Sequence, residues 1–217
     1  MPGLIKNNHF IWITIALIGL MLTNAFSRNV PENLTLNLIE WLGTALLLLS
    51  LLSLKTNRKW GKGFLIIVVV MLAVVVARGA TEIGQFEYLY LGLMLLFMLA
   101  AAWLVGSQVL LTGTVDLNII VGSVALYLLI GYIYALFYTI LLEFSPNALN
   151  GVDAGFWYDN LSTTTYFSFV TLTTLGYGDI SPSTPVAQVI VILEAVTGMF
   201  YLAVIVASLI GGRRDRG

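Results

Sequence analysis

The sequence has no cysteine, and few of its residues carry a charge. Its 217 residues include no thiol, which excludes disulfides, thiolate metal sites and cysteine catalysis. Charged residues make up only 10% of the chain, against about 25% in soluble domains, and the net charge of −1 offers nucleic acid no basic surface. Hydrophobic residues reach 59%, above the usual share of about 45–50%. This composition indicates a protein that lies in a lipid bilayer.

Six apolar runs divide the chain, and each is close to the length of about 20 residues that a helix needs to cross a bilayer. We therefore expect an all-α membrane protein with six transmembrane helices. A signal peptide is the rival interpretation of the first run, since Ala25-Phe26-Ser27 resembles a small-residue cleavage site. We expect this run to be retained as a helix. The six runs cover residues 10–26, 36–54, 64–80, 88–111, 117–142 and 186–210.

Most of the basic residues gather at one set of helix ends. Positive residues favour the cytoplasmic side of a membrane, so both termini are expected in the cytoplasm and residues 143–179 outside. We expect the membrane to be the plasma membrane of a prokaryotic cell. The residues on the basic side are Lys6, Lys55, Arg58, Lys59, Lys62, Arg213, Arg214 and Arg216, whereas the other side has only Arg28 and Arg78.

Residues 173–179, which read Thr-Thr-Leu-Gly-Tyr-Gly-Asp, form a loop between apolar segments. Glycine reaches backbone dihedral angles that other residues avoid, so Gly176 and Gly178 allow successive carbonyls to point the same way. A row of aligned carbonyls can hold a dehydrated cation. Because one strand supplies few oxygens at each level, we expect several copies around an axis.

This loop resembles the selectivity filter of potassium channels, in which Thr-Val-Gly-Tyr-Gly segments from four subunits replace the hydration shell of K⁺ with carbonyl oxygens. The sequence has leucine where valine is commoner, a mild departure because that position contributes its carbonyl. The resemblance implies a homotetramer that contacts membrane lipid and binds K⁺ without any other cofactor. The residues that it implies for K⁺ coordination are Thr174, Leu175, Gly176, Tyr177 and Gly178.

The resemblance covers nearly half of the chain and implies a pore domain at residues 113–217. The short apolar segment before the filter cannot cross a bilayer, so we expect it to be a re-entrant helix with Asp159 as its N-cap. The expected parts are an outer helix at residues 117–142, a turret at 143–159, a pore helix at 160–172, the filter at 173–179 and an inner helix at 186–210.

Residues 1–112 are similar to voltage-gated channels only in plan, as a peripheral domain of four helices. Voltage sensing requires basic residues on the fourth helix, but residues 88–111 contain no lysine or arginine. We therefore expect weak voltage dependence or none. Glu40 and Arg78 fall at similar depth on the second and third helices, and we expect them to pair. Since only seven residues follow Ile210, we expect gating to arise within the membrane part.

Side chains on the pore helix are expected to hold the filter, because irregular backbone at membrane depth must be buried in protein or line water. Tyr166 stands where the family usually has a tryptophan bonded to the filter aspartate, so we predict that its hydroxyl reaches Asp179. The alternative is an aromatic ring that packs without this bond. Val170 is apolar where some relatives carry a buried glutamate, which predicts no carboxylate pair there. The other expected supports are Phe167, Thr171 and Thr173.

Gly198 lies 20 residues after Gly178 and matches the hinge glycine of the family's inner helix. Glycine within a helix costs about 1 kcal/mol relative to alanine, so it indicates a bend or a close helix contact, and we predict a hinge. Glu194 lies one turn earlier in an apolar run, where an ionisable residue is a functional candidate. It either braces the filter through pore-helix hydroxyls such as Thr171 or Thr173, or titrates as a gate. The residues expected to line the cavity and lower gate are Met199, Leu202, Val206 and Ile210.

Together these patterns predict a channel that conducts K⁺ passively. A less selective monovalent cation channel is one alternative, and a non-conducting membrane subunit or a transporter is another. Related transporters usually keep one filter glycine in each of four repeats, whereas this chain has two glycines and one repeat. We do not expect an enzyme, because the sequence shows no combination of nucleophile and base and no metal-binding pattern.

Overall fold

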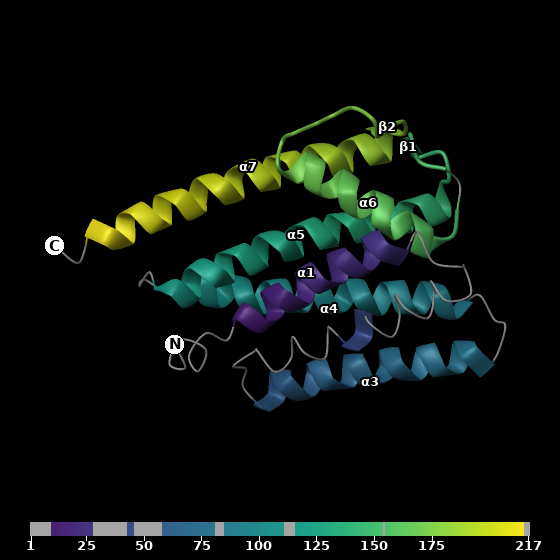
Figure 1. Ribbon diagram of the computed structural model, residues 1–217, viewed down its shortest axis with the longest axis horizontal. Helices are drawn as coiled ribbons and strands as arrows, with labels where there is room; N and C mark the ends of the chain where they lie inside the picture. Colours follow the sequence, from purple (N-terminus) through teal and green to yellow (C-terminus); the bar gives the residue numbers. More distant parts are fainter. Residues whose placement is uncertain are drawn as a thin grey trace. The chain divides into compact units, whose positions relative to one another are not determined.

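The computed structural model describes residues 10–27, 43–45, 58–80, 85–110, 116–153 and 155–214 (Figure 1). Most of these residues are helical, and two short strands form the one sheet found in the described ranges. The elements in chain order are α1 (Phe10–Ser27), α3 (Arg58–Ala80), α4 (Gln85–Leu110), α5 (Leu117–Phe144), β1 (Leu149–Asn150), α6 (Trp157–Leu172), β2 (Ser181–Pro182) and α7 (Pro185–Arg214).

Three helices within the described residues are long and apolar enough to cross a membrane. These spans are Phe86–Val109, Leu117–Phe144 and Pro185–Ile205, and the segments Phe10–Thr23 and Lys62–Ala77 are apolar but shorter. Residues 36–54, expected as the second helix, lie outside the described residues apart from 43–45. A plan of six transmembrane helices therefore remains a prediction.

The chain divides into two compact units, and the first contains α1, α3, α4 and the beginning of α5 up to Leu129. Helices α3 and α4 lie side by side, and the Phe64 ring meets the Phe97 ring edge to face at 5.4 Å (Figure 1). A Cβ on Gly122 of α5 would lie 2.8 Å from atoms of both Phe10 and Val109. The absence of a side chain at Gly122 therefore lets α5 approach α1 and α4 closely.

The division into a peripheral domain and a pore domain between residues 112 and 113 remains a prediction, whereas the two compact units divide within α5, between Leu129 and Ile130. The reason is that α5 is one continuous helix whose first turns pack inside the first unit. Gly106 of α4, for example, has Leu126 within 3.5 Å of the position of its missing Cβ. The expected pair of Glu40 and Arg78 falls outside the residues whose side chains are described.

The second unit contains the rest of α5, the two strands, α6 and α7. Its hydrophobic core joins the end of α5 to the start of α7 through α6 and the strands, and a buried bond of 2.7 Å between the Thr139 and Thr164 hydroxyls links α5 to α6. Figure 1 shows the loop after α6 returning to β2, which pairs with β1. The buried core residues are Tyr138, Leu142, Ala148, Leu149, Phe167, Ile180 and Ala187.

Helix α6, expected as the pore helix, begins earlier than the sequence suggested, and its N-cap is Phe156, not Asp159. Trp157 and Tyr158 are almost fully buried, so the apolar packing of these rings starts the helix before the polar residues that follow. Asp159 lies in the first turn, where a carboxylate interacts favourably with the helix dipole. The outer and inner helices also extend past their expected ends, to Phe144 and Arg214.

Helix α7 is mostly uncovered by its own chain, with only 11% of the span Pro185–Ile205 buried. Large apolar side chains such as Ile192 and Phe200 are more than 60% exposed. Exposing so much apolar surface to water would be costly, at about 25 cal/mol for each Å². This helix therefore requires lipid or further protein around it.

Candidate functional site

The backbone of residues 173–179 changes the sign of φ at alternate positions. The φ angles are 61° at Thr174, 56° at Gly176 and 80° at Gly178, and Thr174 is the one non-glycine residue with positive φ in the described ranges. Leu175 and Tyr177 between them keep the ordinary sign. A backbone that alternates in this way turns successive amides to one side and successive carbonyls to the other. The loop thus has the geometry that a row of carbonyl ligands needs.

The end of α6 holds the first part of this loop. The amide of Thr174 donates to the carbonyl of Thr171 at 2.9 Å, and the amides of Leu175 and Gly176 donate to the carbonyl of Val170 at 3.0 and 3.3 Å. The last carbonyls of a helix have no partner within the helix, so these bonds satisfy both the helix end and the loop. With their amides held by α6, Leu175 and Gly176 are fixed with the helix.

Within one chain the loop has no cover. All residues from 173 to 179 are exposed, with Leu175 at 60% and Tyr177 at 68%. A Cβ on Gly176 or Gly178 would meet no atom within 4 Å. Unpaired backbone groups at membrane depth must be buried in protein or face water, so this loop needs a partner surface or a water-filled space.

Tyr166 binds the outer end of the loop to α6. Its hydroxyl donates to the carboxylate of Asp179 at 2.7 Å, which confirms the predicted bond. The same hydrogen bond raises the pKa of Tyr166, since it stabilises the protonated phenol. The bond joins residues 13 positions apart and closes the loop against the helix that precedes it.

A second attachment of the loop comes after residue 179, from the segment between α5 and α6, and it was not predicted. Strand β2 pairs with β1, and the amide of Ser183 donates to the carbonyl of Ala148 at 2.9 Å. Gly151 has φ of 79°, and a Cβ there would overlap the carbonyl oxygen of Asp179. Only the presence of a glycine in a polar loop hinted at such a contact.

The expected supports Phe167 and Val170 face the body of the unit. The Phe167 ring packs on Tyr138 of α5 at 4.9 Å, and Val170 is buried. Phe169 also faces α5, where a Cβ on Gly131 would lie 2.6 Å from its ring. These side chains position α6, so any support that they give the filter is indirect. Gly131 was not among the residues that the sequence singled out.

The carboxyl of Glu194 is fully buried and joins three helices. The Tyr138 hydroxyl of α5 donates to Glu194 Oε2 at 2.6 Å, and Ser168 Oγ of α6 contacts Glu194 Oε1. A hydroxyl partner on α6 was predicted and is found, but it is Ser168 and not one of the two examples, Thr171 and Thr173. The Thr173 hydroxyl donates instead to the carbonyl of Phe169 at 2.6 Å. The brace interpretation fits this geometry.

Gly198 lies where α7 crosses the end of α6. A Cβ on Gly198 would overlap the carbonyl oxygen of Leu172 and lie 3.0 Å from Leu172 Cδ1. Helix α7 continues through this position without interruption. Close helix contact, the alternative to a hinge, is sufficient to explain the glycine, and the hinge remains a prediction.

The residues expected to line the cavity are described only in part. Met199 and Leu202 are exposed on α7. A residue that lines a cavity between chains has to be exposed in one chain alone, but most apolar residues of this helix are exposed as well. The side chains of Val206 and Ile210 fall outside the described set. Cavity lining therefore remains a prediction for all four.

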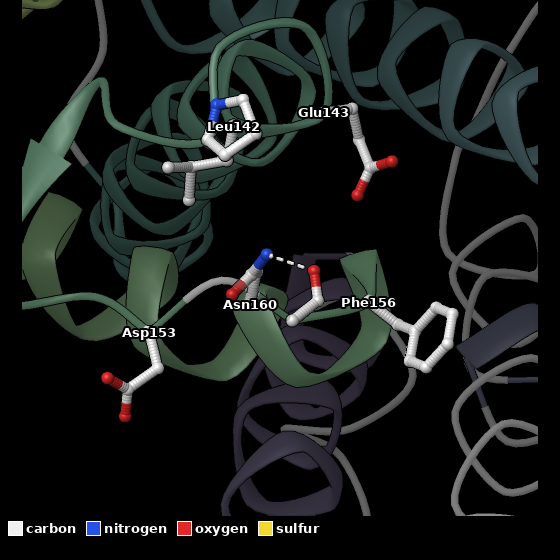
Figure 2. Close-up of a pocket in the computed structure, with 7 residues that line it drawn as sticks. Leu142, Glu143, Asp153, Phe156 and Asn160 are labelled. Atoms are coloured by element: carbon white, nitrogen blue, oxygen red, sulfur yellow. Dashed lines mark hydrogen bonds between the residues drawn. The ribbon is translucent and has the colours of Figure 1, made fainter.

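A pocket of about 320 Å³ lies between the end of α5 and the start of α6 (Figure 2). Glu143 and Asn160 lie on opposite sides of the space (Figure 2). The side-chain amide of Asn160 donates to the carbonyl of Gly155 at 2.9 Å. No residue from 173 to 179 contributes to it, so this pocket is separate from the loop that was expected to be the filter. Its lining residues are Leu142, Glu143, Pro146, Asp153, Gly155, Phe156 and Asn160.

We predict that Gly198→Ala destabilises the protein by roughly 1–2 kcal/mol, because the clash with Leu172 outweighs the gain of about 1 kcal/mol in helix propensity. Thermal unfolding of the purified protein in detergent measures this change. Gly92→Ala on α4 is the matched control, since nothing lies within 4 Å of a Cβ there. Equal stability of the two variants would contradict the contact.

We also predict that Tyr166→Phe increases the rate of hydrogen exchange at the amides of residues 176–180 several-fold, because the loop loses its tie to α6. Hydrogen–deuterium exchange with mass spectrometry measures the rate. Tyr88→Phe, at an exposed position on α4, is the control. Unchanged exchange in Tyr166→Phe would show that the hydroxyl does not hold the loop.

The comparisons with known proteins agree with this geometry. Residues 120–211, from the first turn of α5 to the end of α7, match the family model described as "Ion channel". The searches of curated proteins and of solved structures gave no match. The matched segment contains residues 173–179 and most or all of two of the three described helices that are long enough to span a bilayer. The chain is thus a membrane protein whose second half is similar to ion channels, and this match supports an ion-channel function.

Proposed function

We propose that the chain forms a homotetrameric channel that conducts K⁺ selectively through residues 173–179. The observation that carries this proposal is the alternating sign of φ at Thr174, Gly176 and Gly178 in a loop that its own chain leaves uncovered. Each loop presents one row of carbonyls, so four loops around an axis would surround a dehydrated ion, as in potassium filters. The carbonyls of residues 174–177 and the Thr174 hydroxyl would be the ligands.

The charges of the pore half favour a cation. Between Arg78 and Arg213 the sequence contains no lysine, arginine or histidine, but it has eight acidic residues. A permeating cation therefore meets no fixed positive side chain from this part of the chain, and acidic residues raise its local concentration. The carbonyl end of α6 adds a partial negative charge near the start of the filter.

The remaining roles follow from the attachments of the loop. Tyr166, Asp179 and the carbonyls of Val170 and Thr171 would keep the carbonyl row in register. Gly198 would allow α7 to pack against α6, with or without a bend at this position. On the uncovered side of α7, the proposed cavity and gate residues are Met199, Leu202, Val206 and Ile210.

We further propose that the channel lies in the plasma membrane with both termini in the cytoplasm and the filter opening outward. The basic residues at the expected inner ends of the helices support this orientation. Residues 88–111 contain no lysine or arginine, and most of them form α4, so the peripheral helices would respond weakly or not at all to voltage.

The first test is the flux of K⁺ and Na⁺ through the purified protein in liposomes, with barium as a blocker. We expect strong preference for K⁺ and loss of flux in Gly178→Ala, because alanine at a φ of 80° costs about 1–2 kcal/mol in every chain. Gly92→Ala is the control for handling and reconstitution. Native mass spectrometry should show four chains in each particle.

Other outcomes separate the alternatives. Equal flux of K⁺ and Na⁺ would show a less selective cation channel, which a filter held by the partly exposed Tyr166 bond would explain. Absence of flux from a correctly folded tetramer would favour a non-conducting subunit and would contradict the proposal.

A further inference from the structure

The hydroxyl of Ser168 lies between two acceptors. Ser168 Oγ is 2.7 Å from the carbonyl oxygen of Gly131 on α5, and it also contacts Glu194 Oε1 on α7. A serine hydroxyl has one proton, and a backbone carbonyl can only accept. Ser168 can therefore donate to one of these two oxygens and must accept from the other if both contacts are hydrogen bonds.

The carbonyl cannot donate, so the donor has to be Glu194. An ionised carboxylate only accepts, whereas a protonated carboxyl has one O–H donor and one remaining acceptor oxygen. With the proton on Oε1, Glu194 donates to Ser168, Ser168 donates to Gly131, and Tyr138 donates to Oε2 at 2.6 Å. Every polar atom of the cluster then has a partner. An ionised Glu194 would leave one buried pair of oxygens in contact without a hydrogen.

The surroundings also disfavour a charge. Glu194 is fully buried, and a buried carboxylate without a cation is costly. The chain has no basic residue between Arg78 and Arg213, and this segment of an identical subunit would add none. Tyr138 and Tyr134 on α5 are the titratable groups on the facing side, and the Tyr134 hydroxyl bonds to Thr197 at 3.0 Å. On α6 the facing group is Ser168, which has no charge.

We propose that Glu194 is a protonated carboxylic acid at neutral pH and acts as a hydrogen-bond donor that positions α6. The cluster of Gly131, Tyr138, Ser168 and Glu194 ties α5, α6 and α7 together at one point. Ser168 lies two residues before Val170, whose carbonyl holds the amides of Leu175 and Gly176. The carboxylic acid thereby fixes the start of the filter loop. The importance of Glu194 for conduction rests on the proposed channel function, whereas the protonation of Glu194 does not depend on that function.

Infrared difference spectroscopy tests the protonation directly. The spectrum of the wild type minus that of Glu194→Gln, at neutral pH in liposomes, should contain the carbonyl stretching band of a protonated carboxylic acid. A carboxylate band in its place would show that Glu194 is ionised and would overturn the proposal. This readout requires no flux, so it stands even if the channel function fails.

A pair of variants tests the positioning. Glu194→Gln keeps one donor for Ser168 and one acceptor for Tyr138, and we expect hydrogen exchange at Leu175 and Gly176 within about twofold of the wild type. Glu194→Leu keeps similar bulk but neither polar group, and we expect exchange there to be about tenfold faster. Equal exchange in both variants would overturn the positioning role. If Glu194→Leu does not fold, a protein with both Ser168→Ala and Tyr138→Phe replaces it. We expect hydrogen exchange at Leu175 and Gly176 to be about tenfold faster in this protein as well. Exchange equal to that of Glu194→Gln would overturn the positioning role.

Discussion

A backbone that presents a row of carbonyls cannot satisfy its own polar groups, and several contacts of the second unit compensate for this constraint. The amides at the start of the loop bind the last carbonyls of α6, which a helix leaves without partners. The outer end binds through Tyr166 and Asp179. Between these two attachments the loop remains open on one side, which is the side that an ion and neighbouring chains would use.

Holding the loop this way requires α6 itself to be fixed. Two features fix it, which are close helix contacts at glycines and hydrogen bonds between buried polar side chains. Gly131 of α5 leaves room for the ring of Phe169 on α6, and Gly198 lets α7 approach the backbone of α6 at Leu172. Close approach then brings short polar side chains within reach of each other, as in the pair Thr139 and Thr164. In a membrane, where apolar surface alone does not drive helices together, such small residues and polar contacts supply specificity.

The sequence predicted the parts of the site that depend on local order. The two glycines Gly176 and Gly178 indicated where the backbone takes positive φ, and the resemblance of Tyr166 to the family's tryptophan predicted its bond to Asp179. The partner of Glu194 could not be predicted, because it depends on how α6 is rotated against α7. That rotation follows from the burial of Phe167 and the contact of Phe169 with Gly131, which are tertiary effects.

The pairing of β1 with β2 determines where the segment that contains α6 joins the rest of the second unit. The two strands bring together the end of α5 and the start of α7, so the segment between Asn150 and Ser181 leaves and returns at one place. The helices α5 and α7 thus form a hairpin, and α6 with the loop that follows it is an insertion between them. The chain thus enters and leaves this segment at one place, while the buried contacts of α6 with α5 and α7 hold the segment within the unit.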